Sequence, residues 1–128
     1  MDEEPVTKYV CAFMRDAHIK GSVINITLVG GLNFILNMTI ALGKYNIKVN
    51  LVAPDIFKSA ITSSLLEKDW LDKVVKKTYP LQTLGTTDPA LTSLIVYLIG
   101  DDSNYVTGNA FVVDSGGALA GVPIYSSL

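Results

Sequence analysis

The chain is poor in the residues that build disulfides and metal centres. Its 128 residues include one cysteine, Cys11, and one histidine, His18. A single cysteine cannot form a disulfide within the chain, and this scarcity is typical of proteins from reducing compartments. Zinc sites are built mainly from several Cys and His ligands, so we expect no zinc centre. We interpret His18 as a surface residue at a helix end rather than an acid–base group.

Positive charge is also scarce. Ten Lys and Arg residues stand against twelve Asp and Glu residues, which gives a net charge of −2 at pH 7. Binding to a nucleic-acid backbone requires a basic surplus, so this balance argues against a nucleic-acid partner. The acidic start of the chain, MDEEPV, lacks the basic and apolar segments of a secretory signal. We therefore expect a protein that is not secreted, located in the cytoplasm or in an organelle with a reducing interior.

A third absence concerns charge of either sign, because no charged residue lies between Lys20 and Lys44. That interval is long enough to cross a bilayer. Polar residues and a pair of glycines interrupt it, however: Asn25, Asn33, Asn37, Gly30 and Gly31. Its apolar residues form a continuous run over 22–28 and then fall at helical spacing over 32–44. This change of period predicts a buried strand, a turn and a helix, and no membrane span.

What the chain does contain is a large apolar fraction. Apolar residues make up 49% of the chain and charged residues 17%, proportions that are typical of a globular protein and exclude intrinsic disorder. A chain of this length forms one domain with a sizeable core. We therefore treat residues 1–128 as a single domain.

Short apolar runs alternate with segments of helical periodicity. The runs predict strands at 22–28, 47–53 and 110–113. The periodic segments predict helices over 6–17, 32–44, 59–77 (one helix or two) and 88–99. Asp88 and Pro89 are expected as N-cap and first helical residue, residues 79–87 as a loop, and residues 116–128 as an irregular tail. This alternation indicates a three-layer α/β fold, with about three parallel strands and helices on both faces of the sheet.

Five segments match, in order, a pattern of one known family. They are G-S-V-I-N-I-T at 21–27, G-K-Y-N-I-K-V-N at 43–50, V-A-P at 52–54, P-L-Q-T-L-G at 80–85 and Y-V-T-G to V-D at 105–114. Together they resemble the carboxyl-terminal half of the short-chain dehydrogenase/reductases. Residues 19–22 and 32–44 are most similar to dicarbonyl/L-xylulose reductase-like or 3-oxoacyl-reductase-like members.

The resemblance implies a Rossmann-like partial fold from an NAD(P)-dependent oxidoreductase of small carbonyl or alcohol substrates. The family's first βαβ unit, whose glycine-rich turn binds the dinucleotide pyrophosphate, has no counterpart in these 128 residues. Three explanations of this absence stand side by side: a truncated isoform, a shortened gene model and a decayed copy.

The family's catalytic residues are also unmatched. The position of its catalytic serine is Leu28, which has no hydroxyl. Its catalytic tyrosine precedes a lysine by four positions, and none of the six tyrosines here has a lysine at that spacing. Tyr45 and Lys48 match the family's turn before a strand, and we assign them to that turn. Because the tyrosine donates a proton to the developing alkoxide, its loss predicts that this chain is catalytically inactive.

The segment after V-A-P contributes to the family's nicotinamide site. The resemblance assigns Pro54, Phe57 and Ser59 to the binding of NAD or NADP. The glycine that follows this proline in the family is Asp55 here, and its negative charge should repel an anionic cofactor. We therefore expect no NADH or NADPH binding at sub-millimolar concentration, and we interpret Pro54-Asp55 as a turn after a strand.

One further motif is similar to a sequence found in a different class of enzyme. Residues 114–117, D-S-G-G, look like the sequence around a serine-protease nucleophile. With one histidine and an α/β pattern, the chain favours a tight turn after the last strand at this point.

An alternative function is a non-catalytic module that assembles with itself or with a full-length relative. In the complete family sheet, the strand at 22–28 has a neighbour on each side, and here one neighbour is missing. An apolar strand with an unpaired edge is a template for another chain. The helices at 6–17 and 32–44 resemble those with which the family builds dimers and tetramers. We expect association at this edge, against the competing expectation that the first helix or the tail from Gly116 covers it.

Overall fold

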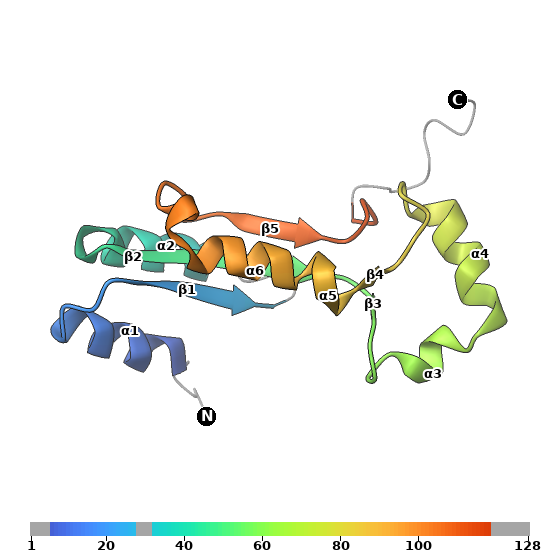
Figure 1. Ribbon diagram of the computed structural model, residues 1–128, viewed down its shortest axis with the longest axis horizontal. Coiled ribbons are helices and arrows are strands. Elements are labelled where there is room, and N and C mark those ends of the chain that lie inside the picture. The colour runs from blue at the N-terminus through green and yellow to red at the C-terminus, as the bar shows by residue number, and fades with distance from the viewer. Residues whose placement is uncertain (1–5, 28–31, 119–128) are drawn as a thin grey trace.

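The computed structural model describes residues 6–27 and 32–118, which Figure 1 shows as a ribbon. Three strands, β1 (Gly21–Ile26), β2 (Ile47–Pro54) and β5 (Ala110–Val113), form a parallel sheet in the order β1-β2-β5. The register places Gly21 opposite Ile47 and Leu51 opposite Ala110. The predicted parallel sheet is confirmed, although β1 is shorter than expected. Leu28, the expected end of that strand, lies outside the described residues.

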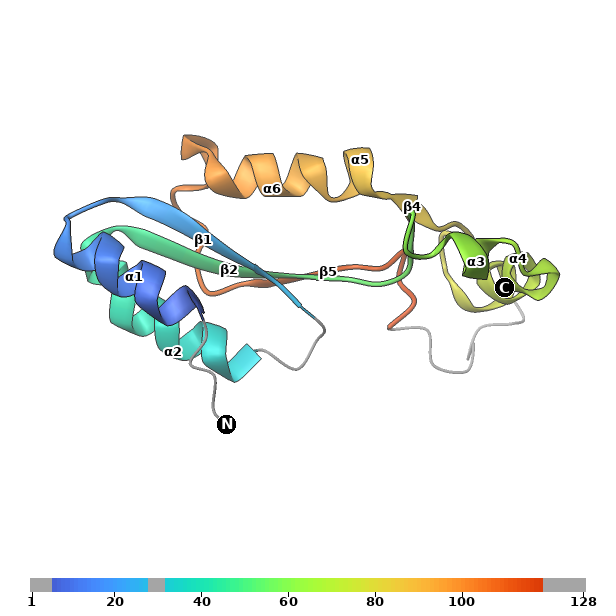
Figure 2. The ribbon, with the colours of Figure 1, turned by 90° about the horizontal axis from the view of Figure 1, so that it is seen from below.

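Helices cover both faces of this sheet, as a three-layer α/β fold requires (Figure 2). α1 (Val6–Asp16) and α2 (Leu32–Leu42) lie on one face, and α5 (Thr87–Ala90) and α6 (Thr92–Ile99) lie on the other. The 3-10 helices η2 (Gly43–Tyr45) and η3 (Asp101–Ser103) follow α2 and α6. The charge-free interval is thus β1 followed by α2, as predicted, and its glycine pair lies outside the described residues. In the described part of the chain, no helix combines the length and apolar character that a membrane span needs.

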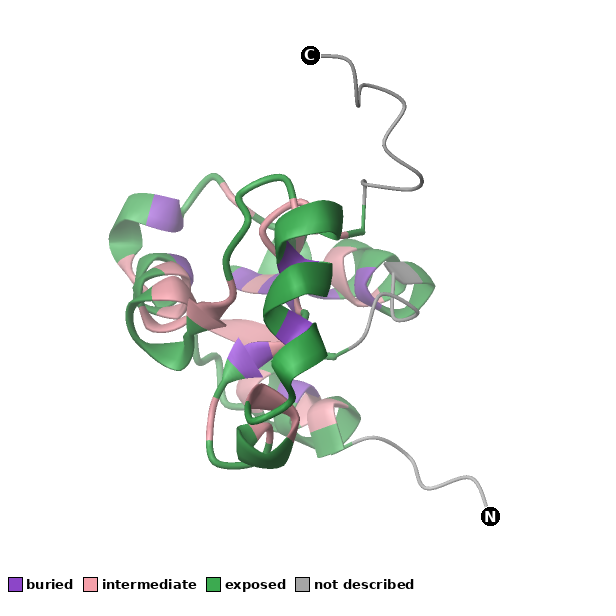
Figure 3. Cartoon of the chain, turned by 90° about the vertical axis from the view of Figure 1, so that its right-hand side faces the viewer, coloured by how far each residue is buried: buried purple, intermediate pink, exposed green. Residues whose placement is uncertain are grey.

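The main core lies between β2 and the helices α1 and α2. Side chains alternate between the two faces of a strand, so every second residue of β2 points toward these helices. The buried cluster formed there consists of Ile47, Val49, Leu51 and Ala53 from β2, Cys11 from α1, and Ile35 and Leu42 from α2. Each fully buried large aliphatic side chain stabilises the fold by about 1.5–3 kcal/mol. Figure 3 colours the chain by burial and shows buried positions as short bands among exposed and half-buried ones.

On the opposite face of β2, polar side chains form hydrogen bonds with the segment between α6 and β5. Asn50 is fully buried, and its Nδ2 donates to the carbonyl oxygen of Val106 at 3.0 Å while its Oδ1 accepts the N–H of Asn109 at 3.2 Å. The Nζ of Lys48 donates to the Oγ of buried Ser103 at 2.8 Å. Because buried polar groups are costly without partners, these bonds fix the connection between α6 and β5 onto the sheet.

Residues 57–86 form an excursion at one end of the sheet (Figure 1). They contain β3 (Phe57–Lys58), α3 (Ser63–Leu66), α4 (Asp69–Thr78) and β4 (Gly85–Thr86), and β3 pairs in parallel with β4. The two helices agree with the helical spacing over 59–77. The loop predicted over 79–87 is wrong at its end, where β4 and the first residue of α5 lie. A two-residue strand depends on its distant partner, and the local pattern carries no signal for it.

The expected helix start at Asp88 and Pro89 is also wrong in detail. α5 begins at Thr87, and Asp88 inside it is extended, with φ −106° and ψ 125°. A residue before proline is driven away from the helical region, so the regular helix α6 begins only at Thr92. Asp88 still contributes there, because its Oδ1 accepts a hydrogen bond from the Oγ1 of Thr92.

Candidate functional site

The candidate site lies at the carboxyl ends of β2 and β5, the edge of an open parallel sheet where ligands usually bind. Pro54, the last residue of β2, is half-buried and lies opposite Val113 of β5. The N–H of Asp55 then donates to the carbonyl oxygen of Val113 at 3.1 Å. The two strand ends are thereby held together, and the exposed carboxylate of Asp55 stands at their edge.

Phe57 and Ser59, the other residues assigned to the cofactor, are both bonded to Thr62. The Oγ1 of Thr62 donates to the carbonyl oxygen of Phe57 and accepts the N–H of Ser59 at 3.0 Å. The Oγ of Ser59 lies 3.2 Å from the same Oγ1. The Phe57 carbonyl and the Ser59 hydroxyl therefore already have partners within the chain. The assignment of Pro54, Phe57 and Ser59 to cofactor binding stays a prediction.

The side chain of Phe57 is directed into the protein. It is buried, and its ring lies so close to Gly85 that a Cβ added there would be 2.7 Å from the ring carbon Cε1. The sequence contains little that predicts the role of Thr62. The only local signal is its position three residues after Ser59, a spacing at which hydroxyl side chains often bond to the nearby backbone.

Tyr79 joins the end of α4 to the end of β2. Its hydroxyl donates to the Oδ2 of Asp55 at 2.5 Å. Burial, the hydrogen bond to Asp55 and the negative charges of Asp55 and Asp114 raise the pKa of Tyr79 to about 12. A tyrosine with this pKa is a poor proton donor or base near neutral pH. We therefore assign its hydroxyl to a structural tie between the excursion and the sheet.

The chain turns sharply after β5, as predicted for D-S-G-G. The carboxylate of Asp114 accepts the N–H groups of Gly116 at 2.8 Å and of Ala118 at 2.7 Å. Ser115 and Gly116 both have positive φ, of 57° and 84°. Only glycine adopts this left-handed conformation at no steric cost, so Gly116 suits the turn and Ser115 is unusual in it.

This turn packs directly on the residues after α4. A Cβ added to Gly116 would lie 2.7 Å from the Cγ of Pro80, and one added to Gly117 would lie 2.8 Å from the Cε1 of Tyr79. The N–H of Leu81 donates to the carbonyl oxygen of Ser115 at 3.3 Å. We call this contact between residues 79–81 and 115–117 the latch. Beside it lies a pocket of about 200 Å³.

Tyr45 and Lys48, which the sequence assigns to a turn, lie at the other end of the sheet. Tyr45 belongs to η2 and Lys48 to the start of β2, so both are at the amino end of the strand that carries Asp55 at its other end. The Nζ of Lys48 is bonded to Ser103, and the ring of Tyr45 lies under the Nζ of Lys44 at 5.2 Å. Tyr45 thus lies in the turn before β2, as expected, whereas Lys48 lies within β2 itself. Leu28, the position of the family's serine, lies outside the described residues. Within 6–27 and 32–118, no group of His, Cys, Asp and Glu is placed to hold a metal ion.

Comparisons with known proteins agree with this arrangement. A protein-family model described as enoyl-(acyl carrier protein) reductase matches residues 32–118. The 3-oxoacyl-acyl-carrier-protein reductase of Buchnera aphidicola is 32% identical over 87 residues, which cover 68% of this chain and 34% of that protein. The 3-alpha-(or 20-beta)-hydroxysteroid dehydrogenase of Mycobacterium bovis is 31% identical over 122 residues, which cover 80% of this chain and 43% of that protein.

Solved structures show the same fold over almost the whole chain. A 4-hydroxyisoleucine dehydrogenase complexed with NADH superposes with a TM-score of 0.83 at 26% identity, over 91% of this chain and 54% of that one. A gluconate 5-dehydrogenase of Burkholderia cenocepacia, in complex with NADP and tartrate, has the same fold with a TM-score of 0.79 at 22% identity. The chain thus spans 54% and 51% of these two structures, and 34% and 43% of the two curated relatives. On its parallel sheet, its ordered motifs and these matches, the chain belongs to the short-chain dehydrogenase/reductase family.

Proposed function

We propose that this chain is the carboxyl-terminal portion of a short-chain dehydrogenase/reductase for small carbonyl or alcohol substrates, and that the 128-residue polypeptide alone is catalytically inactive. The lineage is supported by the reductase and dehydrogenase relatives. Two solved dehydrogenases of the same fold, one complexed with NADH and one with NADP, support NAD or NADP as the cofactor class. The inactivity rests on one observation, the lack of the family's Ser, Tyr and Lys in this sequence.

The missing groups matter because carbonyl reduction creates negative charge on oxygen. A positioned acid that protonates the developing alkoxide contributes typically about 10²–10⁴-fold to the rate. Leu28 offers no hydroxyl to orient a carbonyl. Tyr79 is unsuited to the role of acid, because its proton is held by Asp55 and its pKa is raised to about 12.

The residues that would contact the nicotinamide are also poorly suited to bind a cofactor. The carbonyl oxygen of Phe57 is already bonded to Thr62. The carboxylate of Asp55 stands at the end of β2, at the position where the family has glycine. This negative charge opposes the approach of a dinucleotide phosphate.

Turnover is the direct test of inactivity. The purified chain is assayed with NADH or NADPH against dicarbonyls, ketoses and 3-oxoacyl substrates, and we expect no rate above the protein-free control. Leu28→Ser should remain inactive, because it restores the orienting hydroxyl without the proton donor. A turnover that disappears in Tyr45→Phe would contradict the proposal and identify a substitute acid.

The second candidate function is assembly, and the free edge of β1 favours it. The N–H groups of Gly21 and Thr27 donate to carbonyl oxygens on the β2 side, at 3.3 and 3.0 Å. Because alternate residues of a parallel strand direct their backbone groups to opposite sides, those of residues 22, 24 and 26 point to the other side. Within the described residues, β1 has no strand partner there. Such a row of backbone donors and acceptors can pair with a further strand.

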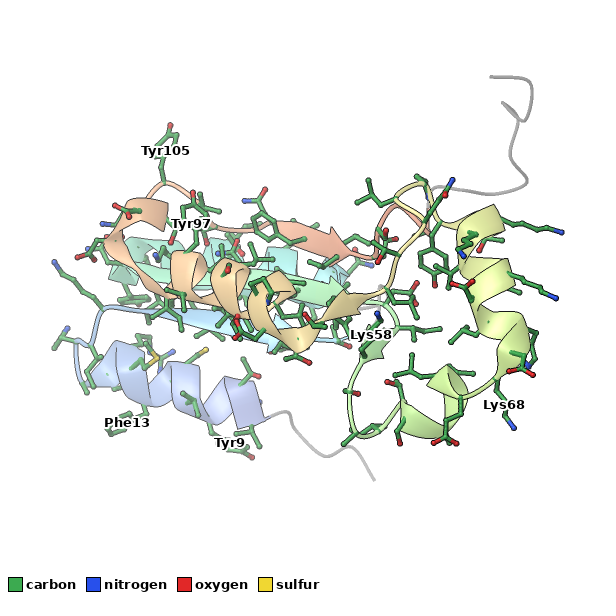
Figure 4. The ribbon with its side chains drawn as sticks, turned by 45° about the vertical axis from the view of Figure 1, so that its right-hand side comes forward. Tyr9, Phe13, Lys58, Lys68, Tyr97 and Tyr105 are labelled. Atoms are coloured by element: carbon green, nitrogen blue, oxygen red, sulfur yellow. The ribbon has the colours of Figure 1, made fainter. Side chains whose placement is uncertain are left out.

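The outer side of α1 adds apolar surface next to this edge. Val6, Tyr9 and Phe13 are 76%, 62% and 65% exposed. Figure 4 shows Tyr9 and Phe13 on the side of α1 that faces away from the sheet. Contiguous apolar surface of this kind marks contact sites between proteins. We propose that the chain associates with itself or with a full-length relative through this region.

Light scattering with matched variants tests the assembly. We expect a mass above the 13.8 kDa of one chain. Ile26→Pro removes an outward-pointing N–H at an exposed position and should weaken association, whereas Ile26→Thr keeps the N–H and serves as its control. Phe13→Glu should also weaken association, and Tyr105→Glu, at a fully exposed tyrosine far from α1, should not. A stable monomer of the unmodified chain at tens of micromolar would contradict the assembly proposal. The family assignment would not be affected.

A further inference from the structure

The amino ends of β1 and β2 border a pocket of about 580 Å³, at the opposite end of the sheet from the candidate functional site. Four segments that are distant in sequence form its wall: the start of β1 with Lys20, the turn before β2, the end of α6 with η3, and Thr107 before β5. The proposed function assigns no role to this pocket. The charges and polar groups of its wall indicate what it can hold.

Lys48 contributes a half-buried positive charge to the wall. Its Nζ donates to the carbonyl oxygen of Gly100 at 3.0 Å and to the Oγ of Ser103 at 2.8 Å. Gly100 lies between two other lining residues, Ile99 and Asp101, so the ammonium group is held at the edge of the pocket. Both bonds are to neutral partners, whereas an ammonium group has three N–H donors and a full charge. Lys48 therefore retains one N–H and has no carboxylate counter-ion within the described residues.

Lys20 places a second positive charge beside the first. It lines the same pocket, is exposed, and forms no ion pair within the described part of the chain. Ser22, two residues further on, lies opposite Lys48 in the parallel register of β1 and β2. Because like charges repel, two unpaired ammonium groups at one pocket favour a ligand that carries negative charge. Asp101 is the one carboxylate among the described lining residues, so the wall keeps a net positive charge.

Two amide side chains in the wall are available to a ligand. Asn46 and Asn104 are exposed lining residues, and neither side chain forms a hydrogen bond within residues 6–27 and 32–118. An amide side chain can both donate and accept, which suits a hydroxyl group. The carboxylate of Asp101 is likewise unbonded in the described chain and can accept from a hydroxyl. The wall thus combines positive charge with groups that bind hydroxyls.

These features define the chemistry of the occupant. A phosphate monoester carries about two negative charges at neutral pH, and lysine ammonium groups are common partners of phosphate. A pocket of about 580 Å³ has room for a small molecule beyond the phosphate itself. We propose that this pocket binds the phosphate monoester of a small polyol. The phosphate lies between Lys20 and Lys48, and the hydroxyls bond to Asn46, Asn104 and Asp101.

Glycerol 3-phosphate is the probe, added to the full chain in a low-salt buffer without other phosphate while two-dimensional amide NMR spectra are recorded. For a ligand of this size, we expect saturable shifts with a Kd on the order of 1 mM. The shifts should concentrate around the pocket, at the amides of Gly21, Asn46 and Asn104. The amides of Gly85 and Gly116, at the other end of the sheet, should not move and serve as internal controls. No dinucleotide or carbonyl substrate is present, so the result does not depend on the proposed function.

Two further ligands separate the contributions of the phosphate and the polyol. Glycerol carries no charge and should cause no saturable shifts at the same concentrations. Inorganic phosphate lacks the hydroxyl-bearing carbon chain and should bind about two- to tenfold more weakly than glycerol 3-phosphate, the range for one neutral hydrogen bond. Added sodium chloride should weaken the binding of both anions, because salt screens exposed charges.

Variants of the wall test each group in turn. Lys20→Gln, at an exposed position, should weaken the binding of both anions about two- to fivefold and leave the melting temperature unchanged. Lys73→Gln removes the same charge from an exposed position of α4 and should leave both Kd values unchanged. Asp101→Asn should tighten the binding of both anions, because it removes the negative charge from the wall. Asn104→Ala should weaken the binding of glycerol 3-phosphate about two- to tenfold and leave that of inorganic phosphate unchanged.

Four results would overturn the proposal: no saturable shifts around the pocket, equal weakening by Lys20→Gln and Lys73→Gln, weaker binding in Asp101→Asn, or binding of glycerol 3-phosphate no tighter than that of inorganic phosphate. The second of these would mean that anions respond only to the net charge of the chain.

Discussion

Replacement of Gly116 by alanine should destabilise the chain more than any other small change at the carboxyl ends of the strands. The added methyl group would lie 2.7 Å from the Cγ of Pro80, 3.0 Å from its Cδ and 3.2 Å from its Cβ. Contacts below 3.0 Å force a shift, and the ring of a proline has little freedom to move. The φ of 84° adds a second cost, because alanine disfavours the left-handed region.

The two costs can be added to give a magnitude. A left-handed backbone costs a non-glycine residue about 1–2 kcal/mol. Overpacking a closely packed contact costs about 1–3 kcal/mol. We therefore expect Gly116→Ala to lower the free energy of unfolding by about 2–5 kcal/mol. Domains are stable by only about 5–15 kcal/mol in total, so this is a large fraction.

Urea denaturation followed by tryptophan fluorescence measures the effect. The chain has one tryptophan, Trp70, which lies in α4, the helix whose end forms the latch. For a small protein, the loss should move the midpoint by on the order of 1–2 M urea. Gly43→Ala is the matched control, because an added Cβ there has no neighbour within 4 Å. It should change stability by less than about 1 kcal/mol.

A double-mutant cycle with Pro80→Ala separates the two costs. Removal of the ring removes the clash but leaves the strained backbone, so Gly116→Ala should cost only about 1–2 kcal/mol in that background. If Gly116→Ala costs no more than Gly43→Ala in the unmodified chain, the latch is not packed as described and the reasoning is refuted.

Two other predictions concern titratable groups. The pKa of Tyr79 is raised to about 12, so its contribution to stability is complete below pH 10, the usual tyrosine value, and is lost as the pH rises through 12. Unfolding free energy measured across this range should fall with pH in the unmodified chain and fall less steeply in Tyr79→Phe, and equal slopes would show that Tyr79 is not held by Asp55. Burial raises the pKa of the Cys11 thiol, which is 2% exposed. Ellman's reagent should therefore label it slowly in the folded chain at pH 8 and rapidly in urea, and rapid labelling of the folded chain would mean that α1 does not pack on the sheet.

The central strand of the sheet could be predicted from the sequence because it is buried on both faces. A strand of this kind, such as β2, is a continuous apolar run bounded by turn residues, which is a strong local signal. The amphipathic helices α1 and α4 carried an equally local signal in their spacing. β3 and β4 had none, because each has two residues and exists only through the other.

The site was less accessible to prediction for a related reason. Resemblance assigned Pro54, Phe57 and Ser59 to this region, and that assignment stays a prediction, but the groups that hold the region together are paired across the chain. Tyr79 bonds to Asp55, which is 24 residues away in sequence. The latch joins residues 79–81 to 115–117 through close packing, which has no periodic pattern. The turn at 114–117 was predictable from its glycines, whereas the unpartnered hydroxyl of Ser115 appears only when its surroundings are known.

Titration calorimetry with NADH and NADPH tests the central claim most directly, namely that the carboxyl ends of these strands do not form a working cofactor site in this polypeptide. The purified chain is titrated with each cofactor, and a full-length family member serves as the positive control in the same buffer. The account predicts no heat beyond that of dilution for this chain at sub-millimolar cofactor. A micromolar dissociation constant for either cofactor would contradict it, because Asp55 would then have failed to repel the phosphates and a pyrophosphate site would exist without the family's glycine-rich turn.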